Sequence, residues 1–489
     1  MITKSLFDLR KPRDECAVFG VFNNKDAAAL TVLGLHALQH RGQDSTGIVS
    51  FSEKFLKFYG HRGIGQVSEV FGNSDIIKKL EGNSCIGHNR YGTTGETALK
   101  NVQPLFSEIL TGGIAIAHNG NLTNTNTLKN DLINSGSIFQ STSDTEVILH
   151  LISTTKGSLI DRLIYALHSI SGAYSLVMLS NDTLFGLRDP LGIRPLVLGK
   201  LNDSYILSSE SCGLDIIGAE LIRDVEPGEI VLINKQGLKS IKPFNNAKLR
   251  PCLFEYIYFS RPDSVLEGKN VYEVRKNIGT ELAKESKKDD IKIDKVVPIP
   301  DSGNASALGF SEYIKKPFEF GIIRNHYTGR TFIEPSNSIR HLGVKLKHNP
   351  NLASIKNQSI ALIDDSIVRG TTSVKIVEML RSSGAKEIHM RIASPPVKHP
   401  CYYGIDTPSD DELLASKYTV EEIAKIIGVD TLKFISLDGV YRALGFKNGR
   451  NNKDPEYTDH YFSGDYPVKL VDKTIGNKPS QLSLLIETK

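Results

Sequence analysis

Residues 360–373 read IALIDDSIVRGTTS, an apolar run that ends in two carboxylates and continues into a loop and a row of hydroxyl residues. This order predicts a buried strand, a short loop through Gly370 and the first turn of a helix. Backbone N–H groups in such a loop point toward an anion, and the helix dipole favours negative charge there. Asp364 and Asp365 cannot bind a phosphate themselves, but they suit sugar hydroxyls or hydrated Mg²⁺. The stretch therefore predicts a site for a ribose 5-phosphate.

A plainer interpretation of this stretch is an acidic turn followed by an ordinary Thr or Ser helix cap. That interpretation suits the Asp pair alone better than it suits the whole string of strand, carboxylates, loop and hydroxyl residues. A Walker phosphate loop is excluded, because the sequence contains no G-x-x-x-x-G-K-[ST].

Apolar runs and helical patterns alternate around this stretch from about residue 260 onward. A helix is predicted at 271–285, where apolar residues follow helical spacing. The further predicted elements are a strand at 295–300, a helix from Ala305, a strand at 360–364, a helix from Ser373 and a strand at 387–393. Fully apolar strands that alternate with helices predict a parallel sheet wrapped by helices.

Two stretches of the second half lack any periodic pattern. Residues 324–350 are long and polar, which is typical of a functional lid. Beyond about residue 450 the chain is polar and rich in turn residues, so we expect a surface wrap there.

The first half of the chain, to about residue 240, follows a different pattern. Short apolar runs recur at 17–22, 113–118 and 174–179, and Gly and Asn turns separate them. Few helical patterns intervene. This arrangement predicts strand-rich antiparallel layers with helices packed on them.

Composition places the chain among globular proteins. Of its 489 residues 23% are charged and 40% hydrophobic, and the formal net charge is +4. Basic residues are dispersed, so we expect no nucleic acid partner. No apolar run approaches the roughly 18 residues of a membrane helix, and the first residues lack the apolar core of a signal peptide. Five scattered cysteines do not suggest a secreted disulfide framework, so we expect a soluble cytoplasmic protein.

Cys16 begins a strand-like stretch, and by itself it reads as a small buried apolar residue. Asn119 and Gly120 likewise suit a two-residue hairpin turn, and Ser143 with Glu146 suits a capping box at a helix start. These residues nevertheless belong to a series of polar strings, which are QHRGQ at 39–43, GHNRYGT at 87–93, HNGN at 118–121 and SDTE at 143–146.

Together and in this order, the strings resemble the class II glutamine amidotransferases, whose nucleophile is an N-terminal cysteine. Residues 360–373 resemble the phosphoribosylpyrophosphate (PRPP) motif of the type I phosphoribosyltransferases, and residues 298–304 stand where that family keeps its pyrophosphate-binding loop. With 254–264 and 403–406 included, the resemblance covers nearly all of residues 16–450.

The resemblance implies an α/β and α+β two-domain fold. Residues 16–243 would form a four-layer αββα Ntn-hydrolase domain that uses glutamine. Residues 244–450 would form a Rossmann-like, parallel-sheet phosphoribosyltransferase domain. Residues 1–15 would be a propeptide and residues 451–489 a C-terminal tail.

The resemblance also implies how glutamine is used. Removal of the first Met cannot expose Cys16, so the peptide bond between Glu15 and Cys16 would be cleaved. The new α-amino group, with an ordinary pKa of about 7.7–8.0, could act as general base for its own thiol. The thiol would attack the glutamine amide and form a γ-glutamyl thioester. The remaining implied residues are Asn119 and Gly120 as the oxyanion hole, Arg90 for the substrate carboxylate, Asp144 for its ammonium, and Thr93 and Arg41 as further glutamine-binding residues.

In the second half, the resemblance implies that PRPP binds with one Mg²⁺ per subunit. Ammonia would cross a shielded apolar passage, closed by 324–350, and would displace pyrophosphate to give 5-phospho-β-D-ribosylamine. This reaction would be a pentosyl transfer and the first step of de novo purine synthesis. The implied metal-linked residues are Ser302, Asp364 and Asp365. The implied PRPP-binding residues are Asp301, Ser302, Asp364, Asp365, Ser366, Val368, Arg369, Gly370, Thr371, Thr372 and Ser373.

Partners and cofactors follow from the same resemblance. It implies feedback inhibition by AMP and GMP and a homo-oligomer, either a dimer or a tetramer. Some members of this family hold a [4Fe–4S] cluster on four cysteines. Here only Cys252 and Cys401 match, and residues 448–466 contain no Cys, so we expect no cluster.

Two alternatives stay open at this point. One is a sibling class II enzyme that makes glucosamine phosphate or asparagine, against which the PRPP motif at 360–373 argues. The other is a non-catalytic, PRPP-sensing regulator on the same scaffold. The presence of Cys16, Arg90, Asn119 and Asp144 argues against a regulator.

Overall fold

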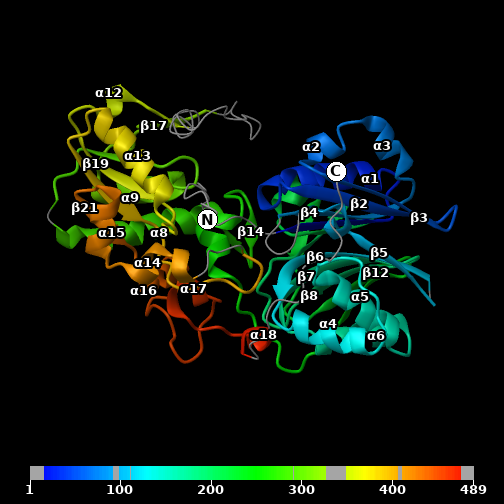
Figure 1. Cartoon of the computed structure of the whole chain (residues 1–489). Coiled ribbons are helices and arrows are strands. Elements are labelled where there is room, and N and C mark those ends of the chain that lie inside the picture. Colours follow the sequence, from blue (N-terminus) through cyan, green and yellow to red (C-terminus); the bar gives the residue numbers. More distant parts are fainter. Residues whose placement is uncertain are drawn as a thin grey trace, which may run out of the picture.

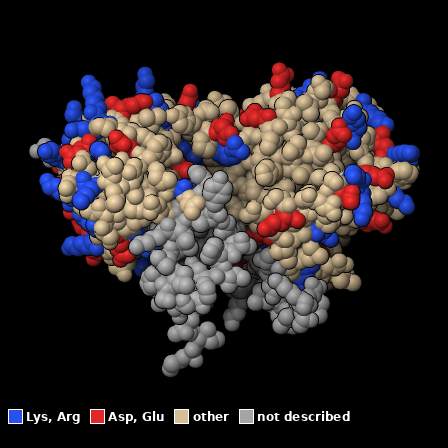
Figure 2. Space-filling view, turned by 90° about the horizontal axis from the view of Figure 1, so that it is seen from above, with Lys and Arg blue, Asp and Glu red and all other residues tan. Residues whose placement is uncertain are grey.

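The computed structural model describes residues 16–91, 98–110, 112–289, 291–325, 348–405 and 410–474. Two parts lie side by side, one built from the first half of the sequence and one from the second (Figure 1). Within the described residues, no helix combines the length and the apolar character needed to cross a membrane. Charges of both signs are interspersed over the face drawn in Figure 2, as the nearly balanced composition predicts.

Two antiparallel sheets form the first part. One has seven strands in the order β11-β9-β10-β1-β4-β2-β3, and the other has six in the order β13-β12-β8-β7-β6-β5. The first sheet contains β1 (Ala17–Phe22), β2 (Ser45–Ser52), β3 (Lys57–Ile64), β4 (Ser84–Arg90), β9 (Val197–Leu201), β10 (Ser204–Ser208) and β11 (Glu220–Asp224). The second contains β5 (Leu105–Ile109), β6 (Gly112–Leu122), β7 (Gly172–Leu179), β8 (Leu184–Arg188), β12 (Ile230–Asn234) and β13 (Gly237–Ile241). The three predicted apolar runs fall in β1, β6 and β7, so the antiparallel prediction is confirmed.

Alternating side chains on β1 divide this part into layers. Phe19 and Val21 pack with α1 (Ala27–Ala37), whereas Val18 packs in the core between the two sheets. Successive strand residues face opposite ways, so one strand contributes to both cores. The outer face of the second sheet is covered by α4 (Thr125–Asn134), α5 (Thr145–Thr154) and α6 (Leu159–Ser169). The result is the expected four-layer αββα arrangement.

A four-stranded parallel sheet forms the second part. Its order is β16 (Lys295–Pro298), β19 (Ser359–Asp364), β20 (Glu387–Ile392) and β21 (Thr431–Phe434). One face packs on α8 (Val271–Ser286), α9 (Asn304–Ile314) and α16 (Leu437–Ala443). The other face packs on α13 (Thr371–Ser382) and α15 (Val420–Ile427). The predicted alternation of strands and helices is confirmed, with α13 beginning two residues before Ser373.

Two helices of the second part touch through glycines. A Cβ added at Gly279 of α8 would lie 1.8 Å from the carbonyl oxygen of Ser306, and one added at Gly309 of α9 would lie 1.9 Å from that of Lys276. Each helix backbone therefore lies directly on the other, and neither contact can relax by moving a flexible side chain. This close packing anchors α8, which also supports the junction between the domains.

The C-terminal tail differs from its prediction. Thr458 and Tyr461 are fully buried, and the backbone of Thr458 forms an isolated parallel β-bridge with that of Cys252. Further along, α18 (Val471–Thr474) lies against α4, where the carboxylate of Asp472 accepts hydrogen bonds from the N–H groups of Asn126 and Thr127 (Figure 1). The expected surface wrap is wrong for this stretch, because the tail enters the core and then ties the second part to the first.

We predict that Gly279→Ala weakens the phosphoribosyltransferase-like part of the chain. A methyl group against a backbone carbonyl must separate α8 from α9, which costs about 1–3 kcal/mol. Gly60→Ala is the matched control, since its Cβ would meet nothing closer than 3.5 Å. Urea unfolding followed by circular dichroism should give a lower midpoint for Gly279→Ala only. Equal midpoints for the two variants would show that the helices are not in close contact.

Candidate active site

Cys16 lies immediately before β1, beside the end of β4. Ala17 pairs with Asn89, and Arg90, which is 6% exposed, is the last residue of β4. The Nε of Arg41 donates to the carbonyl oxygen of Cys16 at 3.5 Å. Strand pairing thus brings the predicted nucleophile next to residues that are far apart in the sequence.

Asn119 and Gly120 lie inside β6 and do not form the hairpin turn that the dipeptide suggests. Gly120 has a φ of 144°, and a Cβ there would lie 2.0 Å from the carbonyl oxygen of Ala173, so only glycine fits. The Asn119 side chain is fully buried, and neither its amide nitrogen nor its oxygen has a hydrogen-bond partner among the described residues. Such unsatisfied groups are rare in protein interiors and often mark functional sites.

Two histidines connect the two antiparallel sheets. The Nε2 of His88 on β4 lies 3.0 Å from the carbonyl oxygen of His118 on β6. Burial lowers the pKa of His88 to about 3, so this imidazole is neutral at physiological pH. The Gln103 side chain accepts from the N–H of His118 at 2.7 Å and lies 3.0 Å from the Thr145 hydroxyl. Sequence reasoning assigned these residues no supporting role, because hydrogen bonds between distant strands leave no local pattern.

Asp144 stands at the N-terminal end of α5. Its carboxylate accepts from the N–H of Leu122 at 3.1 Å and lies 3.5 Å from the Nδ1 of His118. Burial favours the neutral acid, but the nearby imidazole and the backbone donors outweigh it and lower the pKa of Asp144. The capping box that Ser143 and Glu146 suit does not form, since Glu146 accepts hydrogen bonds from the segment just upstream instead.

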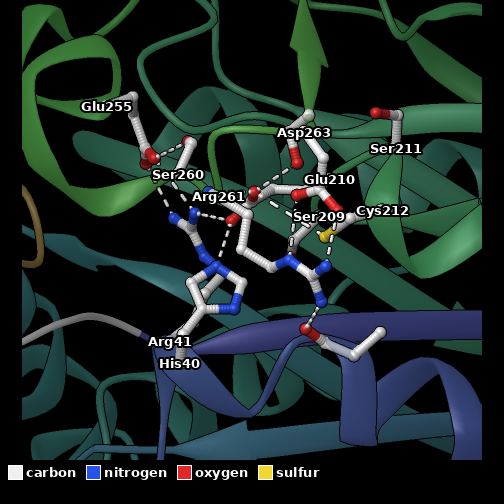
Figure 3. A network of polar contacts seen from close by, with 12 residues as sticks. His40, Arg41, Ser209, Glu210, Ser211, Cys212, Glu255, Ser260, Arg261 and Asp263 are labelled. Carbon is white, nitrogen blue, oxygen red and sulfur yellow. Dashed lines mark hydrogen bonds and ion pairs between the residues drawn. The ribbon is translucent and has the colours of Figure 1, made fainter. Parts of the chain in front are cut away.

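The Arg41 guanidinium lies between two buried carboxylates. Its Nη1 donates to Glu210 at 2.6 Å and to Glu255 at 3.0 Å, and its Nη2 donates to Glu255 at 2.7 Å (Figure 3). With Nε directed to Cys16, every nitrogen of the guanidinium group is engaged by protein. A role of Arg41 as a glutamine ligand stays a prediction. Thr93, the other further glutamine-binding residue predicted, lies outside the described residues.

The predicted phosphate loop follows β19. Asp364 and Asp365 are each 1% exposed at the strand end, and Gly370 precedes α13 with a φ of 74°. Arg369 donates to Glu412 at 2.9 Å, so part of its charge is already paired. The loop and first helical turn contain the other predicted residues, which are Ser366, Val368, Thr371, Thr372 and Ser373.

The loop at 298–304 follows β16, the strand next to β19. Both loops therefore leave the same edge of the parallel sheet, where ligands of such sheets bind. Asp301 is exposed and pairs with Arg324, and Ser302 is half-buried beside it. Of the predicted lid, residues 326–347 lie outside the described residues.

Comparisons with known proteins identify the family. Residues 88–215 match the model of the glutamine amidotransferase domain family. The chain is 54% identical over 480 residues to the amidophosphoribosyltransferase of Rhizobium etli, covering 96% of each chain. It is 43% identical to that of Bacillus subtilis, covering 96% of this chain and 98% of the relative. The chain belongs to the amidophosphoribosyltransferase family.

Solved structures agree with this assignment. One, described as the glutamine PRPP amidotransferase of B. subtilis complexed with ADP and GMP, matches with a TM-score of 0.87 and 43% identity. It covers 93% of this chain and 98% of that one. As a member of this family, the chain is a glutamine-dependent PRPP amidotransferase of purine biosynthesis and a pentosyltransferase. The relatives give no support to the alternative of a non-catalytic regulator.

The two parts of this amidophosphoribosyltransferase family member touch through backbone. A Cβ added at Gly404 would lie 2.9–3.1 Å from three backbone atoms of Gly120. The neighbouring Asn121 donates from its side-chain amide to the carbonyl oxygen of Tyr402 at 2.9 Å. A segment of the second domain thus rests directly on the strand that contains Asn119 and Gly120.

An apolar cluster continues from this contact toward the phosphate loop. Its members from the first domain are Ala173 and Ile193, and those from the second include the side chain of Val368. Val368 therefore faces the junction, and only its backbone can meet a phosphate. The other buried members are Cys252, Phe254, Phe259, Val397, Tyr403, Ile405, Leu413 and Tyr461.

We predict that Gly404→Ala uncouples glutamine use from synthesis. The new methyl group must displace Gly120, so glutamine-dependent product formation should fall about tenfold or more. Synthesis from free ammonia should persist, since the phosphate loop is unchanged. Gly428→Ala is the control, because its φ of 84° imposes similar backbone strain while its Cβ would meet only Val377 at 3.8 Å. Equal losses in both variants would contradict this account of the contact.

Proposed function

We propose that Cys16, once N-terminal, hydrolyses glutamine, and that the ammonia crosses the domain junction to PRPP. The observation that carries this proposal is the buried, unpartnered amide of Asn119 in β6, next to Gly120 and against the second domain. A structural asparagine would satisfy its hydrogen bonds within the fold. An asparagine whose amide binds a developing oxyanion would not satisfy its hydrogen bonds within the fold.

The glutamine reaction starts at the terminal amine. Cleavage between Glu15 and Cys16 would leave an α-amino group that accepts the thiol proton. The thiolate sulfur then attacks the glutamine amide carbon, and ammonia leaves as the thioester forms. Water later hydrolyses the thioester. The Asn119 amide and the Gly120 N–H would stabilise the oxyanion of each tetrahedral intermediate.

Two charged residues would hold glutamine in place. Arg90, at the end of β4, would pair with the substrate carboxylate. The anionic Asp144 would accept the substrate ammonium, and the low pKa of its carboxyl keeps it charged at physiological pH. Thr93 remains a proposed contact beyond the described residues.

PRPP would lie across the two loops at the strand ends. Backbone N–H groups of 366–373 would bind the 5-phosphate, while the buried Asp364 and Asp365 would accept the ribose hydroxyls. Asp301 and Ser302 would face the pyrophosphate. These oxygen donors suit Mg²⁺, which would neutralise charge on the departing pyrophosphate. No group of three or more potential ligands occurs among the described residues, so most other metal ligands would come from PRPP and water.

Ammonia transfer would depend on the apolar cluster between the sites. Ammonia is mostly protonated in neutral water, and ammonium is not a nucleophile. An apolar junction disfavours the charged form and keeps water away. Ammonia then attacks C1 of the ribose with inversion, pyrophosphate leaves, and 5-phospho-β-D-ribosylamine forms.

The proposal includes regulation and assembly. The B. subtilis structure is described with ADP and GMP bound, which supports purine nucleotides as feedback ligands here, with AMP and GMP as the inhibitors to test. A homo-oligomer, dimer or tetramer, is part of the same proposal.

An iron–sulfur cluster is not part of the proposal. The hydroxyl of Tyr461 lies 3.2 Å from the Sγ of Cys252 and 3.5 Å from that of Cys401. The phenol of Tyr461 thus occupies the space where the two thiols approach each other. We expect purified protein to lack iron–sulfur absorption in the visible range, and a stoichiometric iron content would contradict this.

The decisive experiment is Cys16→Ala. Without the thiol, glutamine-dependent synthesis should fall to background, while ammonia-dependent synthesis at high pH should stay within about twofold of wild type. Cys85→Ala, which removes another buried thiol of the same domain, is the control and should retain both activities. Loss of both activities in Cys16→Ala would contradict the proposed division of labour.

Intact mass spectrometry tests the maturation step. Active enzyme should lack residues 1–15 and begin at Cys16. Fully active protein that retains these residues would refute the use of a terminal amine as base.

A further inference from the structure

A cluster of charged side chains joins Arg41 of the first domain to Glu255 of the second (Figure 3). Glu255 begins a π-helix (Glu255–Phe259) and is 2% exposed. Its carboxylate accepts from both terminal nitrogens of Arg41, from Arg194 at 3.1 Å and from the Ser260 hydroxyl at 2.5 Å. π-helical turns are rare and frequently lie at functional sites.

Arg41 connects this carboxylate to the nucleophile. One edge of its guanidinium meets Glu255 at 2.7–3.0 Å, and Nε reaches the Cys16 carbonyl oxygen at 3.5 Å. The guanidinium is rigid and planar, so a carboxylate that holds one edge also sets the position of Nε. Glu255 belongs to the second domain, whereas Arg41 and Cys16 belong to the first.

Glu210 holds the same arginine from the first domain. It accepts from Arg41 at 2.6 Å and contacts the Nε2 of His40 at 2.7 Å. Its other oxygen accepts from the Arg261 N–H and the Ser264 hydroxyl, both in the segment after Glu255. The two glutamates therefore hold Arg41 between the domains.

The position of Glu255 depends in turn on the PRPP domain. Arg275 on α8 is buried and donates to the carbonyl oxygens of Tyr256 and Ser260, each at 2.8 Å. Burial lowers the pKa of Arg275, and the charge of Asp365 at the phosphate loop opposes that shift. The π-helix that contains Glu255 is thus supported by a buried cation on α8 of the second domain.

We propose that Glu255 is a positioning residue for glutamine hydrolysis, which it serves from the other domain by holding Arg41 against the Cys16 carbonyl. This inference rests on the proposed role of Cys16. Glu255 touches neither substrate, so its effect should appear in the rate of thioester chemistry and not in glutamine affinity. Glutamine hydrolysis would accordingly require the second domain to be in place.

Glu255→Gln tests the proposal with the full-length, mature enzyme. The neutral amide retains the shape of the side chain but loses the charge that orients Arg41. The kcat of glutamine hydrolysis should fall about 10- to 100-fold, with the glutamine KM changed less than about threefold. Alkylation of Cys16 by an electrophilic glutamine analogue should slow in parallel, and ammonia-dependent synthesis should be unchanged.

Glu229→Gln is the matched control. Glu229 is also buried and binds Arg223 through both oxygens at 2.7 Å, but neither residue touches the Cys16 region. This variant should retain normal glutamine kcat. If Glu255→Gln does not fold, Ser260→Ala removes one hydrogen bond to Glu255 without unbalancing charge, and it should lower the same kcat about two- to fivefold.

Three results would overturn the inference. They are a normal glutamine kcat in Glu255→Gln or Ser260→Ala, an equal loss of ammonia-dependent synthesis, and a loss confined to glutamine KM. Full glutamine activity in Cys16→Ala would instead refute the proposed function itself, so the two failures are distinguishable.

Discussion

Arg41 and Arg194 meet Glu210 and Glu255 out of water, and the mutual neutralisation of these four charges constrains how the two domains fit together. A buried charge without its partner typically costs about 3–5 kcal/mol. Both glutamates have pKa values below the ordinary range. Burial favours the neutral acid, but His40 and Arg41 outweigh it at Glu210, and Arg41 and Arg194 outweigh it at Glu255. A shift of either domain would separate Glu255 from Arg41 and Arg194. The geometry around Cys16 is therefore a property of the domain junction.

The rest of the junction has the opposite character. Beside the charged cluster, Gly404 lies on Gly120 without any side chain between them, and the apolar cluster extends from there to Val368 at the phosphate loop. Polar groups near Cys16 hold the two domains together, while apolar groups fill the junction beside them. Such an arrangement suits the transfer of a neutral molecule that water would protonate. Different residues at one interface thus position the two domains and form its apolar part.

Local patterns predicted much of this molecule. The alternation of strands and helices after residue 260 and the strand, carboxylates and loop at 360–373 appear in the structure almost as expected, because hydrophobic period and helix capping act over a few residues. The interpretation of Asn119-Gly120 as a turn was wrong, because these residues pair with β7 and belong to a strand. The prediction that the tail lies on the surface was also wrong, since Thr458 and Tyr461 pack beside Cys252.

By itself, the sequence determined the fold class, the order of the two domains and the residue types available for chemistry, since these depend on periodicity and on motifs within short segments. Only the tertiary structure decided that Arg41 pairs with two glutamates, that the Asn119 side chain has no hydrogen-bond partner among the described residues, and that Gly404 covers Gly120. These outcomes depend on contacts between residues up to about 280 positions apart, such as Asn121 with Tyr402. Short-range patterns contain no information about which distant partner will satisfy a buried charge or a glycine contact.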